Sequence, residues 1–468
     1  MRYPLLGKGL ALGAVALTLM AALAMVSDIV HERQGRLREA EQGVADSLAT
    51  RQILVGPVLQ QQCQESWDEV VVKDNKSQTV RSQREFEVIT TPASLDIKTS
   101  TQLAPRYRGI YKVNGYSATS DIAAEFSVPS LPKPSKDKGV VRCETASLWV
   151  AVSDARGLAK AELLVNERSL PVLPGTAHRA HPRGFQAKLP EEWAASKTSL
   201  HVHVKLDLLG TTQLGFAPLA DNNRVTLTSD WPHPSFTGRA LPNQREINSS
   251  GFNAAWQISG LATAAGQQVQ AGGVACELNG AHAIDGIAMA TQGHATNRVD
   301  CIETFGVGFI EPVNNYTLSD RATKYGLLFI ALTFVGVVLI EVQRRLRVHP
   351  IQYLLVGAAL VMFFLLLVSL SEHLSFAQAY AMASTACTVL LALYGRFVLG
   401  GLRPGLVFGG AIAALYGALF LLLQLEQSAL VLGSILLFSV LACVMMVTRH
   451  IDWYAFTANL RREEQALN

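Results

Sequence analysis

Apolar residues in this chain gather into a few long runs, while the rest of the sequence mixes polar and apolar positions. Between positions 325 and 448 only eight residues are Asp, Glu, Lys or Arg. An α-helix crosses a hydrocarbon core of about 30 Å with roughly 20 apolar residues. The uncharged runs therefore predict five transmembrane helices. Their expected positions are about 325–343, 351–371, 374–395, 404–425 and 427–448.

A sixth apolar run, at 9–27, follows a basic start that contains Arg2 and Lys8. A secretory signal peptide is the alternative interpretation, because residues 22–24 (ALA) imitate a small-residue cleavage site. The run has 19 residues, which exceeds the usual apolar region of a signal peptide. We therefore expect a retained transmembrane anchor that follows a cytoplasmic N-terminus at 1–8.

Residues 28–324 separate the anchor from the five helices and are long enough to bury a sizeable core. Apolar positions at helical spacing predict a helix over 28–52 that rises from the membrane. After Pro57, short runs of alternating polarity such as 201–209 are separated by clusters of proline and serine, which is typical of strands and turns. The predicted fold is thus a membrane α-helical bundle plus a large, mainly-β extracytoplasmic domain, antiparallel and sandwich-like.

Basic residues predict the orientation, since short loops that carry Lys or Arg stay in the cytoplasm. The loops at 341–350 and 396–403 and the tail at 449–468 hold eight arginines, whereas the alternate loops hold none. Both termini are then cytoplasmic and residues 28–324 lie in the periplasm. Three arginines after the first span oppose this assignment, although glutamates are interleaved with them. They are Arg33, Arg36 and Arg38.

Composition excludes some partners and leaves the cysteines ambiguous. The net charge of +3 arises from dispersed residues with no basic stripe, so nucleic acid is not an expected partner, and the bilayer is. Four cysteines fall in the extracytoplasmic domain, where disulfides are allowed. Two bridges would use all four in one of three pairings, and free buried thiols are the alternative. They are Cys63, Cys143, Cys276 and Cys301.

Catalytic signatures are absent from the sequence: it has no Walker A loop, His-Glu-x-x-His, Gly-x-Ser-x-Gly or Cys-x-x-Cys motif. His201 and His203 alternate on a predicted strand, with His178 and His181 in a nearby loop. One face of imidazoles would suit zinc or copper, but scattered surface histidines explain the pattern more simply. We expect no metal and no cofactor, and no catalytic residues.

Charged residues beside the membrane are better functional candidates, because an unpaired charge in lipid is costly. Glu372 and His373 occupy a very tight external turn between two long apolar runs, where they could pair with the domain or bind a proton. Arg321 precedes the second span and could dock the domain at the lipid headgroups. Plain interfacial anchoring is the simpler interpretation of Arg321.

Several short strings occur in order along the domain and the helices, together with Arg321. They are PRYRGIYK (105–112), WPHPSF (231–236), NNY (314–316), KYG (324–326), HPIQY (349–353), SLSEH (369–373) and DWY (452–454). With them the chain resembles the bacterial inner-membrane protein CreD family. The resemblance does not extend to 131–146 and 261–300, so it gives no support for disulfides at Cys143 and Cys276.

The resemblance implies an inner-membrane protein associated with cell-envelope integrity or envelope stress, with no established reaction. We therefore expect a non-enzymatic membrane protein whose periplasmic domain binds a periplasmic or inner-membrane protein. A small-molecule or ion-coupled transporter is the alternative, because five clustered spans exceed what an anchor needs. A membrane-embedded enzyme acting on lipids or cell-wall precursors is a third hypothesis.

Overall fold

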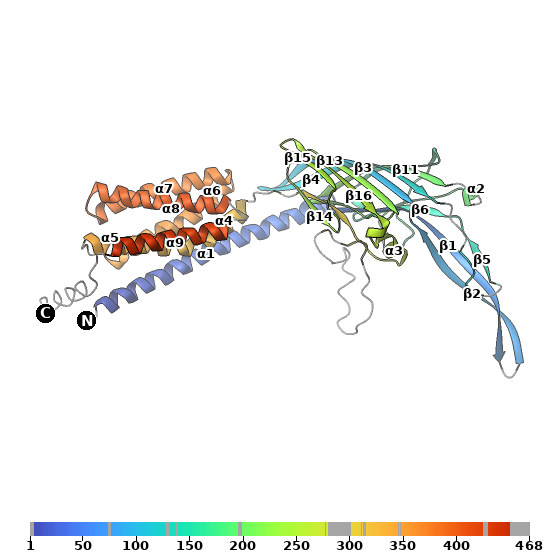
Figure 1. The fold of residues 1–468 in the computed structure, drawn as a ribbon, viewed down its shortest axis with the longest axis horizontal. Coiled ribbons are helices and arrows are strands. Elements are labelled where there is room, and N and C mark those ends of the chain that lie inside the picture. The colour runs from blue at the N-terminus through green and yellow to red at the C-terminus, as the bar shows by residue number, and fades with distance from the viewer. Residues whose placement is uncertain are drawn as a thin grey trace. The chain divides into compact units, whose positions relative to one another are not determined.

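The computed structural model describes most of the chain, which forms two compact units. The described residues are 4–73, 76–127, 132–136, 139–194, 199–276, 278, 301–309, 311, 315–344, 346, 348–424 and 429–449. The helical unit comprises Met1–Leu37 and Val313–Asn468, and the β unit comprises Arg38–Pro312. Figure 1 shows the helices of the first unit and the strands of the second. The predicted fold class, a membrane helix bundle plus a mainly-β domain, is confirmed.

Two sheets make up the β unit among the described residues. The first has the order β14 (Pro234–Gly238), β17 (Phe305–Phe309), β12 (Gln213–Phe216), β1 (Gln52–Lys73), β6 (Ser147–Val152), β10 (Gly184–Lys188) and β9 (Leu173–Pro174), and β2 (Lys76–Thr90) and β5 (Val140–Cys143) also pair with β1. The second has the order β15 (Gln244–Asn248), β16 (Gly251–Ser259), β13 (Asn222–Ser229), β3 (Ser94–Arg108), β4 (Tyr111–Phe126), β11 (Leu200–Thr211), β7 (Leu158–Val165) and β8 (Arg168–Leu170). Most pairings are antiparallel, while β1 with β12 and β3 with β13 are parallel.

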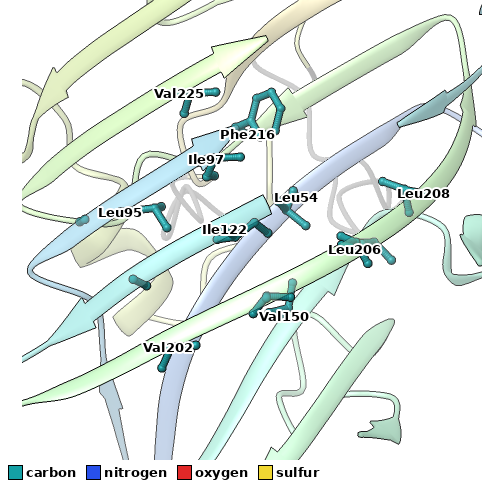
Figure 2. Packing of buried hydrophobic residues seen from close by; sticks show 14 of the residues in the cluster. Leu54, Leu95, Ile97, Ile122, Val150, Val202, Leu206, Leu208, Phe216 and Val225 are labelled. Carbon is teal, nitrogen blue, oxygen red and sulfur yellow. The ribbon is translucent and has the colours of Figure 1, made fainter. Parts of the chain in front are cut away.

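One apolar core lies between the two sheets. Strand β11 alternates buried and more exposed positions along its length, as expected for a strand with one face in a core. Its Val202 and Leu206 join Val150 of β6 and Leu54 of β1 in the same cluster, which Figure 2 shows from close by. Full burial of each such side chain contributes about 1.5–3 kcal/mol. The shared core makes the two sheets a sandwich.

Short helices complete the β unit at its surface. They are the 3₁₀ helices η1 (Ala155–Gly157) and η2 (Gly260–Ala262) and the α-helices α2 (Glu191–Ala194) and α3 (Ala265–Gln270). Helix α3 contributes Ala265 and Val269 to a second, smaller cluster that also contains Trp149.

Long helices make up the helical unit. They are α1 (Pro4–Ser47), α4 (Asn315–Lys324), α5 (Gly326–Arg344), α6 (Pro350–Ser371), α7 (Phe376–Val398), α8 (Leu402–Gln424) and α9 (Ala429–Thr448). The part of α1 after Leu37 belongs to the β unit. Within the described residues five of them, α1, α5, α6, α7 and α8, are long and apolar enough to cross a membrane. The apolar part of α9, Val431–Met446, is shorter.

Small residues bring the helices of this unit close together. Leu19 of α1 packs over Gly357 of α6, where a Cβ on the glycine would lie 2.1 Å from the leucine side chain. Gly409 of α8 has the same relation to Ala392 of α7, at 2.6 Å. In the centre, Phe363 of α6 lies 4.4 Å from the ring of Tyr416. Close contacts of small residues are the usual basis of helix association in lipid.

The boundaries of the β unit differ from those expected for the extracytoplasmic domain. The expected domain was 28–324, whereas the β unit is Arg38–Pro312. Helix α1 continues unbroken past residue 27 because the polar segment after it is rich in the helix formers Glu, Arg and Ala. Residues 315–324 form α4, which contacts α5, α6 and α8 and so belongs with the helices.

Candidate functional site

After its apolar run, α1 continues as a polar segment. One face of this segment packs on the other helices of the same unit. Val26 and Val30 are buried on that face. Residues three and four positions apart lie on the same side of a helix, so Arg33 and Gln34 extend the face of Val30 with polar groups. These side chains meet α4 and the turn between α6 and α7.

Arg33 of α1 lies at the turn between α6 and α7. Glu372 ends α6, and its Oε1 atom lies 3.1 Å from Nε of Arg33. The two side chains are 37% and 16% exposed, so water partly screens the pair. The carbonyl end of a helix carries partial negative charge, which adds to the attraction of α6 for the arginine.

Asn315 of α4 donates hydrogen bonds to the same turn. Its Nδ2 group donates to the carbonyl oxygens of Ser371, at 2.8 Å, and Leu374, at 3.4 Å. The last carbonyls of a helix have no partner within the helix, so this amide supplies part of what α6 lacks. The start of α7 is closed by a capping box between Ser375 and Gln378.

Asp320 of α4 is a second point of attachment for α1. One of its carboxylate oxygens accepts from Nζ of Lys324 at 2.7 Å, and the other lies 3.5 Å from Nε2 of His31. Gln34 donates to the carbonyl of Tyr316 at 3.3 Å. We call the group formed by His31, Arg33, Gln34, Asn315, Asp320 and Glu372 the polar collar. It fastens α1 to the rest of the helical unit.

The three candidate residues of this region have different surroundings. Glu372 lies in the polar collar, paired with Arg33. His373 is exposed, and its backbone N–H donates to the carbonyl of Leu370. Arg321 is half-buried on α4, directly after Asp320. Asn315 and Asp320 were not predicted as partners of these residues. Their signal was weak, since both resemble ordinary residues of a polar segment.

A further carboxylate, Glu341 near the end of α5, is also held by the protein. The hydroxyl of Tyr353 donates to one of its oxygens at 2.7 Å, and the N–H of Val348 donates to the other at 3.2 Å. These bonds connect α5 to the start of α6. The carboxylates of Glu341 and Glu372 therefore each join one helix to another, and Asp320 lies beside His31 of α1.

In the β unit, strands β1 and β2 form a long hairpin that we call the ribbon, residues 52–90 without 74 and 75. Figure 1 shows it leaving the first sheet. At its root the Glu65 carboxylate is buried and accepts four hydrogen bonds. The donors are the N–H and hydroxyl of Ser135, the N–H of Lys136 and the guanidinium of Arg84. The Ser135 hydroxyl bond, with help from the backbone donors and Arg84, outweighs burial and lowers the pKa of Glu65.

A disulfide lies beside Glu65. Cys63 of β1 is bonded to Cys143 of β5, its direct partner across the two strands. A second disulfide joins Cys276 and Cys301. Among the described cysteines, Cys387 and Cys443 are free thiols. Each bridge joins neighbouring segments: Cys63 and Cys143 oppose each other on β1 and β5, and Cys276 and Cys301 lie next to the isolated bridge between Ala275 and Ile302.

The junction of α1 with β1 is a third polar cluster. Gln52 donates to the carbonyls of Asp154 and Leu209. The Asp154 carboxylate accepts from the N–H of Thr50 at 3.0 Å and from Arg156 at 2.6 Å. Burial raises the pKa of Asp154, but the bonds from Arg156 and Thr50 lower it more, so the net pKa lies well below its ordinary value. This cluster holds the start of β1 in the sandwich.

The histidines do not form a metal site among the described residues, where no three His, Cys, Asp or Glu side chains converge. His178 and His181 are buried and stack on Trp149. Burial lowers the pKa of His178, opposed by the nearby Glu87 charge. His203 pairs with Asp121 on the outer face of β11, away from the other two.

Comparison with known proteins assigns the whole chain. Residues 4–454 match the family described as inner membrane protein CreD. The chain belongs to the CreD family. It is 34% identical to the inner membrane protein CreD of Escherichia coli (strain K12) over 459 residues, which covers 98% of this chain and 95% of that protein. The CreD match contains the polar collar and the β unit, and the chain is an inner membrane protein.

Proposed function

We propose that this protein is a non-enzymatic member of the cell envelope that supports envelope integrity or the response to envelope stress. Its β unit is a periplasmic binding domain for a periplasmic or inner-membrane protein. Its helices hold that domain at the bilayer, with both termini in the cytoplasm and six membrane spans. Membership of the CreD family supports the location. The arginines of the loops at 341–350 and 396–403 and of the tail support the orientation, and the contacts among the helices support a scaffold.

The observation that carries the proposal is the polar collar. A proton-coupled transporter needs carboxylates that face a path for its substrate, and an enzyme needs convergent groups with a free reactive atom. Here the Glu372 carboxylate is paired with Arg33, and Asp320 is shared between Lys324 and His31. The contacts of Glu372 with Arg33 and of Asp320 with His31 join α1 to other helices, which is the arrangement expected of a scaffold, while Lys324 pairs with Asp320 inside α4.

A charge exchange in the polar collar distinguishes a scaffold from a transporter. In a Gram-negative deletion strain that is sensitive to envelope stress, the full chain should restore growth. Arg33→Glu alone and Glu372→Arg alone should restore it less, and the two together should restore it again because the attraction returns. If Glu372 instead carried protons, the exchanged pair and Glu372→Gln would both fail. Failure of the unaltered chain to restore growth would overturn the envelope role itself.

The orientation has its own test. Residue 107 is exposed in the β unit, so Tyr107→Cys in intact cells should react with a thiol reagent that does not cross the inner membrane. A cysteine in the C-terminal tail, introduced as Ala466→Cys, should react only after the cells are opened. Reaction of the tail and protection of residue 107 would reverse the proposed topology.

A further inference from the structure

The outer part of the ribbon has a free edge. Strand β2 pairs with β1 from Lys76 to Thr90, and along its other side no strand pairs with it among the described residues. At one end, Ile89 packs on the cluster formed by α3. The stretch from Thr79 to Glu87 lies beyond that contact. Its side chains are exposed or half-buried on both faces of the ribbon.

The alternation of backbone groups shows which residues of β2 face the free edge. Cys63 and Cys143 lie opposite each other with Cα atoms 4.0 Å apart, which is the close spacing of a pair without mutual hydrogen bonds. The next residue confirms the alternation, since the carbonyl of Gln62 accepts from the N–H of Glu144. Cys63 therefore directs its own N–H and C=O toward β2, where its partner is Phe86.

It follows that the even-numbered residues of β2 bond to β1 and the odd-numbered ones point away. The outward N–H and C=O groups belong to Thr79, Arg81, Gln83, Glu85 and Glu87. A row of backbone groups with no strand partner among the described residues is a template for another strand. A two-stranded hairpin outside a sheet is marginally stable in water, so a third strand would also stabilise the ribbon.

We propose that a second copy of this chain pairs with that edge, β2 against β2, antiparallel about Gln83. In an antiparallel pair, residues whose backbone groups point outward must lie opposite residues of the same kind. A two-fold axis between two copies of β2 therefore passes through one residue of the strand. Moving that axis by one residue changes every opposed pair. Axes through Arg81, Arg84 or Glu85 place like charges directly opposite each other, which destabilises a pair of strands. An axis through Ser82 brings no opposite charges together.

The axis through Gln83 is the register in which the edge matches itself. It places Arg81 of each copy opposite Glu85 of the other, on one face of the new sheet. On the other face it places Val80 opposite Phe86. Val80 is 44% exposed in the single chain and would be covered there. About ten backbone hydrogen bonds would form along the nine paired residues.

This self-match is the reason for choosing a second copy as the occupant. The same charged side chains that deter pairing with an arbitrary strand attract a copy of β2 in this one register. Free backbone groups alone would accept any extended peptide, whereas alternating Arg and Glu at equal distances from one residue favour the identical strand. The inference concerns self-association and stands whether or not the proposed envelope role holds.

Disulfide trapping of the full chain in membranes tests the register directly. Opposed residues in a hydrogen-bonded antiparallel pair have Cα atoms about 5.5 Å apart, a separation that a disulfide bridges. Gln83→Cys should therefore yield an oxidant-dependent, reductant-sensitive product of two chains. Thr79→Cys is the matched control, because its two copies would lie eight residues, or roughly 27 Å, apart. The unaltered chain shows any product of Cys387 and Cys443.

If the two strands pair in a single register, the yield of linked chains should be about tenfold higher for Gln83→Cys than for Thr79→Cys. Arg81→Glu added to Gln83→Cys should lower that yield, and adding Glu85→Arg as well should restore it. Equal linking at both positions, linking at residue 79 alone, no linking, or a product that contains a different protein would each overturn the proposal. Membrane levels equal to those of the unaltered chain show that the variants fold.

Discussion

The polar collar and the ribbon use their polar groups in opposite ways. In the polar collar, Arg33 meets Glu372 and Asn315 covers the carbonyl end of α6, so charge and backbone are matched within one unit. In the ribbon, Glu65 secures the root, but the outer edge of β2 presents five residues whose backbone groups have no strand beside them among the described residues. The polar groups of the helices thus bind one another, whereas the β unit retains the outer edge of β2 as a surface for association.

The largest effect is expected from the disulfide at the root of the ribbon. Replacing Cys63 and Cys143 with serine opens a closure between residues 80 positions apart, and the chain-entropy account gives a loss of about 4.5 kcal/mol. Replacing Cys276 and Cys301, which are 25 positions apart, should cost about 3.5 kcal/mol. Thermal unfolding of the full chain in detergent measures both. The reverse order would show that the ribbon root contributes less than proposed.

A smaller, pH-dependent effect is expected from Glu65. Its pKa is lowered from 4.5 by the Ser135 hydroxyl and the other donors. A lowered pKa stabilises the fold above the ordinary value, and this contribution is lost as the pH falls through the lower folded value. The difference in melting temperature between the unaltered chain and Glu65→Gln should therefore be largest near pH 7 and shrink below about pH 4. A difference that grows on acidification would contradict the assigned contacts.

The Arg33–Glu372 pair of the polar collar should contribute less than the disulfide. It is partly exposed, so the coupling energy in a double-mutant cycle should be about 0.5–1 kcal/mol. Arg33→Ala, Glu372→Ala and the double variant supply the cycle, measured from thermal unfolding in detergent. Additive effects of the two substitutions would show that the charges do not act on each other.

The smallest effect is expected from His373, next to Glu372 in the same turn. Its side chain is exposed and its backbone bond to Leu370 survives substitution. His373→Ala should change stability by less than about 0.5 kcal/mol and leave rescue of the deletion strain unchanged. Loss of rescue at a normal membrane level would instead support the transport hypothesis.

Sequence patterns predicted the helices and the strands well because burial determines both. Uncharged runs exceed what a soluble core requires, and alternating runs such as the one in β11 reveal a strand with one buried face. Alternation reports a face and not a neighbour. The parallel pairings of β1 with β12 and of β3 with β13 could therefore not be predicted from it.

The candidate site was only half visible in the sequence. Glu372 stood out because it is a charge between apolar runs, but its partner Arg33 lies far away along the chain and was considered only as evidence about orientation. Nothing in a sequence measures the distance between such positions until the helices pack. The same limit applied to the cysteines, where three pairings were open and strand pairing brings Cys63 to Cys143.

Exchange of charge between two copies tests most directly whether the edge of β2 pairs with a second chain. Only if the two edges pair can a substitution in one copy be compensated by a substitution in the other. Two differently tagged copies of the full protein should copurify from membranes in detergent. Copies that both carry Arg81→Glu should not, and copies that both carry Glu85→Arg should not. One Arg81→Glu copy with one Glu85→Arg copy should copurify again, since each Glu then faces an Arg. Copurification that ignores these charges, or that the mixed pair fails to restore, would contradict the account.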